Sequence, residues 1–270
     1  MSILEALILG IVQGITEFLP VSSSGHLLLL EKITGISEAE GGAFFSTMLH
    51  LATLIAVVIV YRKIILDILK HPLQKLTLYI IIATVPTVIM ALLYKTVLSE
   101  FDAMASDGRL LGVSFLITSL LLVLSDIIVK RRAKKARGLD EMTLKDALIV
   151  GGMQCIGTLP GVSRSGSTIA GALFTGVDRS AAADFSFLMS IPAILGSVVL
   201  EGYDAVKTGG VDIPVLNIIV GMAAAGVTGY FAVKFMLKMI KQKRLYGFAI
   251  YTAALGVLII ADQLILHLVF

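Results

Sequence analysis

Residues 13–26 read QGITEFLPVSSSGH, and the rest of the chain is organised around this stretch. It lies between apolar runs, yet it contains the carboxamide of Gln13, the carboxylate of Glu17, the imidazole of His26 and several hydroxyl groups. Polar side chains of this kind are expensive inside a membrane and usually mark a functional path. A second stretch, QCIGTLPGVSRSGS at residues 154–167, is similar and adds a cation, Arg164. We predict that the two stretches form two halves of one buried anion site.

The composition is that of an integral membrane protein. Of the 270 residues, 57% are hydrophobic and 15% are charged, whereas a soluble domain has about 25% charged residues. The single cysteine, Cys155, excludes a disulfide within the chain. No cleavable signal peptide is expected, because the N-terminal segment carries no Lys or Arg and Glu5 interrupts its first apolar run.

Six apolar segments are long enough to cross a bilayer, which takes about 20 helical residues. We expect these spans at Phe44–Tyr61, Leu76–Tyr94, Leu110–Val129, Phe185–Leu200, Ile213–Phe235 and Tyr246–Val269. Four shorter apolar pieces form two pairs, and each pair is interrupted by Pro, Ser and Gly. The pairs are Ile3–Ile15 with His26–Ile33, and Leu144–Thr158 with Thr168–Val177, the second pair being separated by a break at Leu159–Ser167. Interrupted pairs of this kind predict re-entrant hairpins of two half-helices.

Charge patterning predicts the orientation of the spans. Basic residues cluster at 62–75, 130–137 and 234–244, and acidic residues recur in the intervening connections at 31–40, 100–107 and 201–212. The positive-inside rule places the basic connections in the cytoplasm, so the acidic connections and both ends of the chain are expected outside. The basic run at 130–137 could also be read as a nucleic-acid patch. Beside six spans we assign it to orientation and expect no nucleic-acid partner.

The chain also repeats itself at an offset of 141 residues. Between positions 6 and 25, ten of twenty residues are identical to their counterparts 141 positions later, including the pair Gln13 and Gln154. Each half contains one hairpin and three crossings, and because three is odd the second half enters from the opposite face. The expected fold is an all-α, single membrane domain over 1–270. Its inverted repeats lie at about 1–129 and 143–270, and a cytoplasmic basic connection at 130–142 joins them.

The hairpin turns are expected to meet and to bind an anion, phosphate above all. Serines that precede a helix cap its N-terminus, where free N–H groups and the helix dipole favour phosphate. The guanidinium fork of Arg164 suits phosphate oxygens. The structural alternative is that Arg164 only pairs with Glu17. The predicted substrate-binding residues are Gln13, Ser22, Ser24, Ser163, Arg164, Ser165 and Gly166.

Glu17, His26 and Ser23 complete the predicted catalytic set with Arg164. Glu17 can act as a general base, or it can hold a divalent cation together with Gln13, which lies on the same helical face. His26 can shuttle a proton or attack phosphorus, and Ser23 is a ligand or a nucleophile. The structural alternatives are local pairing for Glu17 and a hydrogen-bonded core position for His26.

Two further polar residues, His50 and Cys155, lie in apolar helical runs. We expect both to serve packing only. The stretch 161–166 lacks the Gly-Lys-Ser/Thr ending of a P-loop, so nucleotide binding of that kind is not expected.

The two stretches resemble the motifs of the bacterial undecaprenyl-diphosphate phosphatase family, whose members confer tolerance to bacitracin. The first motif, (Glu/Gln)-Gly-x-Thr-Glu-Phe-Leu-Pro-Val-Ser-Ser-(Ser/Thr)-Gly-His, matches residues 13–26 at every position. The second, Pro-Gly-x-Ser-Arg-Ser-Gly, matches residues 160–166. The resemblance implies removal of the terminal phosphate from a C55 isoprenoid diphosphate in the bacterial inner membrane. The product is the monophosphate lipid carrier reused in peptidoglycan synthesis.

The resemblance also implies the site and its helpers. It implicates Gln13, Glu17, Ser23, His26 and Arg164, a Mg²⁺ or Ca²⁺ ion, and a site that opens to the extracytoplasmic face. Gln13 stands where other members have Glu, which removes one carboxylate from the site. A cation held mainly by the diphosphate is therefore expected, because Mg²⁺ commonly keeps substrate oxygens and waters. The nucleophile (Ser23, His26 or water) and a homodimer are left open.

A rival interpretation belongs to a different class of protein. Inverted repeats with broken helices are frequent among secondary transporters, so the same site could carry a phosphate-bearing lipid or anion across the membrane. Another membrane phosphatase superfamily uses Ser-Gly-His and Ser-Arg elements, but its Lys-x6-Arg-Pro element is missing from this chain.

Overall fold

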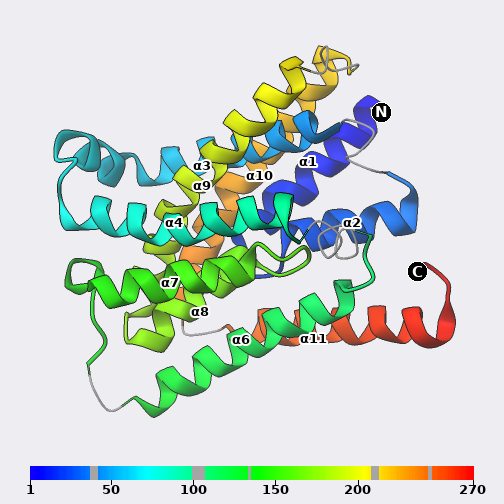
Figure 1. Ribbon diagram of the computed structural model, residues 1–270. Coiled ribbons are helices and arrows are strands. Elements are labelled where there is room, and N and C mark those ends of the chain that lie inside the picture. The colour runs from blue at the N-terminus through cyan, green and yellow to red at the C-terminus, as the bar shows by residue number, and fades with distance from the viewer. Residues whose placement is uncertain (37–41, 99–106, 133–134, 208–212, 243–244) are drawn as a thin grey trace.

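The computed structural model describes residues 1–36, 42–98, 107–132, 135–207, 213–242 and 245–270. Within these ranges the chain is all-helical and contains no strand, as predicted (Figure 1). The helices are α1 (Ile3–Phe18), α2 (Ser23–Thr34), α3 (Gly42–Lys70), α4 (Lys75–Thr96), α6 (Leu111–Arg131), α7 (Leu144–Gly157), α8 (Arg164–Thr175), α9 (Arg179–Lys207), α10 (Val215–Lys241) and α11 (Tyr246–Ala261). A 3-10 turn at Leu139–Glu141 precedes α7, and a π-helical turn at Asp262–Leu266 follows α11.

Six helices are long and apolar enough to cross a membrane, and each coincides with a predicted span. They are Phe44–Lys70, Lys75–Leu93, Leu111–Arg131, Arg179–Val199, Val215–Lys241 and Tyr246–Leu266. The largest difference at a single end is in α3, which continues to Lys70 instead of ending at Tyr61. Charged residues after Tyr61 do not break a helix, so α3 runs on until the segment that contains Pro72. The chain is a multi-pass membrane protein.

The remaining four helices, α1, α2, α7 and α8, contain only 12 to 16 residues each. Helices α2 and α8 begin three and four residues earlier than predicted, because Ser22 and Ser163 cap them. The Ser22 hydroxyl accepts a hydrogen bond from the Gly25 amide at 3.1 Å, and the Ser163 hydroxyl accepts one from the Gly166 amide at 3.0 Å. The predicted break at 159–167 therefore ends at residue 163. The following residues lie in the first helical turns and not in a loop: Ser23, Ser24, Arg164 and Ser165.

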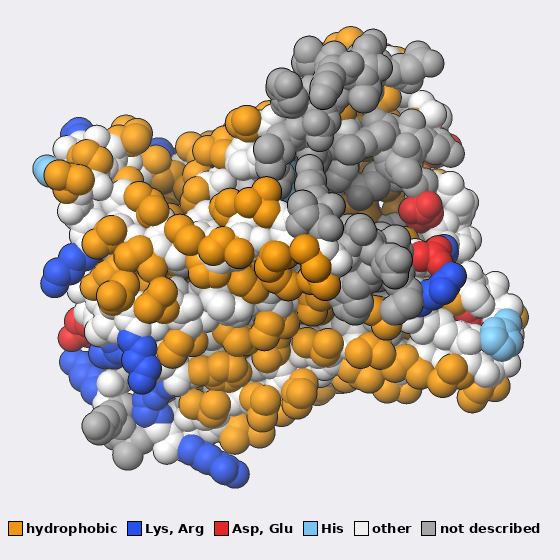
Figure 2. Space-filling model, viewed as in Figure 1, with side chains coloured by type: hydrophobic (Ala, Val, Ile, Leu, Met, Phe, Trp, Pro, Cys, Tyr) orange, Lys and Arg blue, Asp and Glu red, His pale blue; other side chains and the backbone are white. Residues whose placement is uncertain are grey.

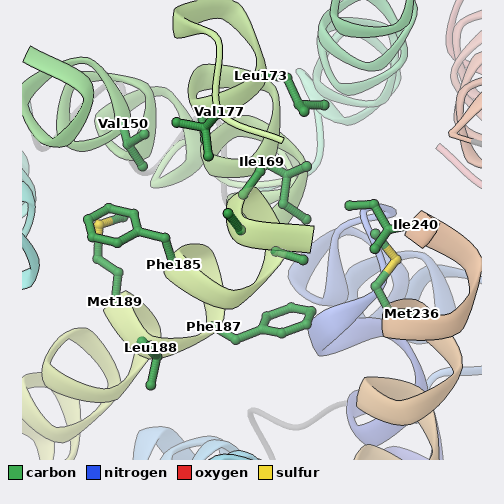
Figure 3. Packing of buried hydrophobic residues seen from close by; sticks show 14 of the residues in the cluster. Val150, Ile169, Leu173, Val177, Phe185, Phe187, Leu188, Met189, Met236 and Ile240 are labelled. Carbon is green, nitrogen blue, oxygen red and sulfur yellow. The ribbon is translucent and has the colours of Figure 1, made fainter. Parts of the chain in front are cut away.

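Helix α8 lies in the interior of the molecule. It packs against α7, α6 and α9, and its residues Ile169 and Leu173 join the main apolar core with Phe185 and Phe187 of α9 and Met236 of α10 (Figure 3). Burial of this helix places its N-terminal residue, Arg164, inside the helical assembly.

Helix α1 lies directly on α10, and small residues on both helices permit this close approach. A Cβ atom added to Gly10 would lie 2.3 Å from the carbonyl oxygen of Gly221, and one added to Gly14 would lie 2.0 Å from Oγ1 of Thr228. Helix α10 in turn packs against α3, while α7 packs against α4 and α6 packs against α11 (Figure 1). The backbone of α1, which carries Glu17, is thereby held against a membrane span.

The surface has the character of a lipid-facing protein. Figure 2 shows an apolar band across the middle of the molecule, with most of the visible Lys and Arg side chains gathered at one end. On α4, Val85, Val88, Ile89 and Leu92 are each at least half exposed. Several residues of the predicted charged connections lie outside the described ranges: Glu38, Glu40, Glu100, Asp102, Lys134, Lys243, Arg244 and residues 208–212.

Candidate active site

The carboxylate of Glu17 is the centre of the candidate site. Glu17 lies in the last turn of α1 and is 7% exposed. Its Oε2 atom accepts hydrogen bonds from Nε2 of Gln13 at 3.0 Å and from Oγ of Ser23 at 2.7 Å. Its Oε1 atom pairs with Nη2 of Arg164. Four predicted site residues, contributed by α1, α2 and α8, are thus brought together at one carboxylate.

The two serine-rich turns touch each other, which confirms the prediction that they meet. Ser165 Oγ donates a hydrogen bond to the carbonyl oxygen of Leu19 at 3.0 Å. In the opposite direction, the Gly161 amide donates to Oγ of Ser24 at 3.4 Å. Helix α6 supports the second turn, because Thr118 Oγ1 accepts a hydrogen bond from the Ser163 amide at 3.0 Å. The two turns are therefore in direct contact with each other.

Two polar atoms in the site are buried without a hydrogen-bond partner among the described residues, Nη1 of Arg164 and Oε1 of Gln13. A buried donor or acceptor without a partner costs about 1–3 kcal/mol, so each such atom calls for an explanation. A guanidinium N–H group is the partner of an anion, and an amide oxygen is a ligand of a cation. The site thus has an unpaired donor that can bind an anion and an unpaired acceptor that can bind a cation.

A cavity of about 430 Å³ opens at Glu17 and Arg164 and has two unlike parts. Its polar part contains Glu17, Arg164 and the serines of both turns. Its apolar walls come from two membrane spans, α4 and α9. The apolar wall residues are Val88, Ala91, Leu92, Pro192, Ala193 and Ile194. Val88 and Leu92 of this wall are each more than half exposed, so the cavity is not sealed from the surroundings of the protein.

His26 is not brought to Glu17, in contrast to the prediction that they share one site. It is absent from the described residues that line the cavity and faces α6 and α11. Its Nδ1 atom lies 2.7 Å from the carbonyl oxygen of Ser22, and its Nε2 atom lies 2.6 Å from the hydroxyl of Tyr251. This arrangement holds the turn that caps α2, and the role of His26 in a reaction stays a prediction.

His50 takes the place expected for His26, and the expectation that it only packs is wrong. It lies on α3, lines the cavity, and places Nε2 at 3.6 Å from Oε2 of Glu17. The sequence held a signal for this residue, because a histidine within a membrane span is an intramembrane ionisable group.

The second half of the repeat contributes no matching carboxylate. Gln154, the counterpart of Gln13, donates a hydrogen bond to Oγ1 of Thr87 at 2.6 Å. Thr158 occupies the position equivalent to Glu17 and donates to the carbonyl oxygen of Cys155 at 2.7 Å. The site is therefore asymmetric, with its carboxylate from the first half and its guanidinium from the second.

Comparisons with known proteins identify the family of this chain. Residues 6–258 match the family model described as Bacitracin resistance protein BacA. An undecaprenyl-diphosphatase of Carboxydothermus hydrogenoformans is 45% identical over 267 residues, which cover 97% of this chain and 98% of the relative. Undecaprenyl-diphosphatase 3 of Bacillus cereus is 41% identical over 97% of this chain and 98% of its own length. An undecaprenyl-diphosphatase of Alkaliphilus metalliredigens is 38% identical over 98% of this chain and all of its own. The chain therefore belongs to the BacA family of bacitracin resistance proteins.

Proposed function

We propose that this protein is an undecaprenyl-diphosphatase, which hydrolyses the terminal phosphate of a polyprenyl diphosphate in the membrane. One observation carries the proposal: a single cavity joins the half-buried Arg164 and the buried Glu17 to apolar walls on α4 and α9. A diphosphate head with an isoprenoid tail is a ligand with the same two parts. The family and the names of its relatives support this activity. The product is the monophosphate lipid carrier that peptidoglycan synthesis reuses.

The residues divide the chemistry between binding and proton transfer. Arg164 Nη1 is a buried donor available to a phosphate oxygen, where it stabilises charge that develops on the transferred phosphoryl group. Ser23 Oγ already donates to Glu17 Oε2. Glu17 is thus in position to take a proton from Ser23, or from a water molecule in the same place, as either attacks phosphorus.

A divalent cation, Mg²⁺ or Ca²⁺, completes the proposed site. Oε1 of Gln13 and the carboxylate of Glu17 are the oxygen donors that such ions prefer. The described residues include no cluster of three or more His, Cys, Asp or Glu side chains that could hold an ion alone. When such an ion is bound, diphosphate oxygens and water would supply the remaining ligands, and the ion would neutralise negative charge on the diphosphate.

We further propose that α1–α2 and α7–α8 are re-entrant hairpins of an inverted repeat, at about 1–129 and 143–270. Helices α2 and α8 begin and end 141 residues apart, which is the sequence offset. The packing is also equivalent, because α1 lies on α10 and α7 lies on α4. With the basic connections in the cytoplasm of a bacterial inner membrane, the cavity opens to the extracytoplasmic face.

Phosphate release by the purified protein tests the proposed function. In detergent, without any gradient, the wild type is expected to release inorganic phosphate from undecaprenyl diphosphate. Glu17→Gln removes the base and is expected to lower the rate by about a hundredfold or more. Glu31→Gln, a carboxylate change on α2 away from the cavity, is the matched control. A wild-type rate equal to the protein-free background would rule the proposal out.

Transport of a phosphate-bearing lipid or anion is the second candidate. The interrupted helix pairs favour it, because broken helices are common at transporter binding sites. A transporter would move its substrate between the two faces of a vesicle without releasing phosphate, so the same assay separates the two functions.

A further inference from the structure

The ring of His50 is held in a definite orientation. Its Nδ1 atom lies 2.9 Å from the carbonyl oxygen of Ser46. A carbonyl oxygen can only accept a hydrogen bond, so Nδ1 carries the hydrogen. In the neutral ring, Nε2 then has a free lone pair on the side of the cavity. A backbone carbonyl on one ring nitrogen, with a lone pair exposed on the other, is the usual arrangement of a metal-binding histidine.

The distances around Oε2 of Glu17 suit a shared cation. His50 Nε2 lies 3.6 Å away, beyond hydrogen-bond range. Two ligands about 2.1 Å from one tetrahedral ion lie roughly 3.4 Å apart. The amide of Gln13 is 3.0 Å from the same oxygen, and its Oε1 atom is buried without a described partner. Rotating this amide by 180° exchanges its oxygen and nitrogen, which brings an oxygen donor toward Glu17.

Arg164 does not pair with Oε2 of Glu17, although Ser23 Oγ and Gln13 Nε2 donate hydrogen bonds to it. Glu17 and Arg164 are the charged groups among the described residues that line the cavity with His50. Arg164 pairs with Oε1, so Oε2 is the carboxylate oxygen that faces the imidazole. A second cavity, of about 140 Å³, borders His50 and offers a polar approach for an ion. Its described lining residues are Ser46, Thr47, His50, Ile194 and Ser197.

We propose that His50 Nε2 and Glu17 Oε2 bind one divalent cation together, with the Gln13 amide oxygen as a third donor. Imidazole favours borderline transition metals, whereas Mg²⁺ prefers oxygen ligands throughout. In the absence of diphosphate, the nitrogen donor is therefore expected to make the site bind Mn²⁺ or Zn²⁺ more tightly than Mg²⁺. When diphosphate is bound, its oxygens supply the ligands that Mg²⁺ or Ca²⁺ prefers. The inference deepens the proposed function. It rests on that function for one point, the diphosphate oxygens that complete the ligand set. Binding of the metal needs no turnover.

Electron paramagnetic resonance of Mn²⁺ tests the proposal. The full-length protein in detergent is freed of metal with EDTA and titrated with Mn²⁺, with and without inorganic pyrophosphate. Pulsed spectra of the wild type are expected to show coupling of bound Mn²⁺ to a histidine nitrogen. His50→Gln is expected to remove this coupling and to raise the Kd for Mn²⁺ at least tenfold. His71→Gln is the matched control, because His71 lies exposed beside Asp67 and should leave coupling and Kd unchanged.

A second variant keeps the test decisive if His50→Gln folds poorly. His50→Glu replaces the nitrogen by oxygen, so it should bind Mn²⁺ without nitrogen coupling and lose the preference for Mn²⁺ over Mg²⁺. Absence of coupling in the wild type, coupling that persists in either variant, or failure of the wild type to bind Mn²⁺ would each overturn the proposal. Coupling in a wild type that releases no phosphate would leave the metal site standing and reject the proposed function. Phosphate release by a wild type that shows no nitrogen coupling would reject the metal site and leave the proposed function standing.

Discussion

The two terminal nitrogen atoms of Arg164 have different surroundings. Nη2 pairs with Glu17, while Nη1 is buried without a partner among the described residues. An ion pair contributes little to the free energy of folding, because desolvation offsets most of its Coulomb energy. A buried donor without a partner, on a side chain that lines a cavity with an apolar wall, is instead what a phosphate oxygen requires. The geometry therefore favours the functional interpretation of Arg164 over the structural one.

Arg164→Lys tests whether Nη2 holds Glu17 while Nη1 donates to a phosphate oxygen. Lysine keeps the charge but is a single point donor, so it cannot contact Glu17 and a phosphate oxygen through a rigid fork. We expect phosphate release to fall about a hundredfold, the usual scale for losing one group that stabilises developing charge. Steady-state rates with undecaprenyl diphosphate measure the effect. Arg62→Lys, on the exposed end of α3, is the control, and a rate for Arg164→Lys within threefold of wild type would contradict the assignment.

Among the elements, α1 positions the carboxylate because its backbone lies against α10. A methyl group on Gly14 would lie 2.0 Å from Oγ1 of Thr228, 2.5 Å from the carbonyl oxygen of Ala225 and 2.8 Å from the amide nitrogen of Gly229. Two of these atoms belong to the backbone and cannot turn aside. Any larger residue at position 14 must therefore move one helix relative to the other.

Gly14→Ala is accordingly expected to lower the thermal unfolding temperature and the phosphatase rate together. Overpacking of this kind costs about 1–3 kcal/mol. Gly152→Ala on α7 is the matched change, because a Cβ atom there meets nothing within 4 Å. It should be neutral or stabilise the helix by up to about 1 kcal/mol. Equal effects of the two substitutions in a thermal shift assay would show that helix contact is not the cause.

The start of α7 is tied to the basic connection by Asp146. Arg137 donates to both of its carboxylate oxygens, at 2.6 and 2.7 Å, and Thr143 caps the helix beside it. Burial raises the pKa of Asp146, but the hydrogen bonds from Arg137 and Thr143 outweigh it and hold the pKa at about 2, below the ordinary 3.8. The carboxylate is therefore more acidic in the folded chain than in the unfolded one.

This lowered pKa predicts a pH-dependent contribution to stability. Because the folded-state pKa lies below the unfolded value, the contribution is present above about pH 4 and is lost as the pH falls toward 2. Asp146→Asn should lower the unfolding temperature at pH 7 and differ little from wild type near pH 2. Thermal unfolding of both proteins in detergent across this range measures the difference. A difference that stays constant with pH would show that the charge of Asp146 contributes nothing.

At the scale of the whole molecule, the proposed inverted repeat requires the two short helix pairs to open to opposite sides of the membrane. Single cysteines in a Cys155→Ala background can report the side. In intact cells, Ser2→Cys and Thr34→Cys, at the two ends of the first pair, should react with a membrane-impermeant maleimide. Asp140→Cys, just before the second pair, and Ser180→Cys, just after it in the first turn of α9, should react only after permeabilisation. Labelling of all four from outside would contradict the inversion.

The sequence by itself determined the membrane character, the six spans and the residues of the two turns. A span is recognisable because its length and hydropathy are local properties. Gln13 and Glu17 share a helical face at a spacing of four residues, and the structure shows their hydrogen bond. The serine runs were expected to cap the two helices, and Ser22 and Ser163 do so. The helices therefore begin before the apolar pieces that mark them in the sequence.

Only the tertiary structure decided which histidine faces Glu17. His26 belongs to the polar stretch but faces Tyr251, whereas His50 comes from an apolar span and lines the cavity. In a membrane, the lipid-facing and core-facing sides of a helix are both apolar, so periodicity does not reveal which side packs inward. The contacts of α3 with α1 and α9 place His50, and those contacts join segments far apart in the chain.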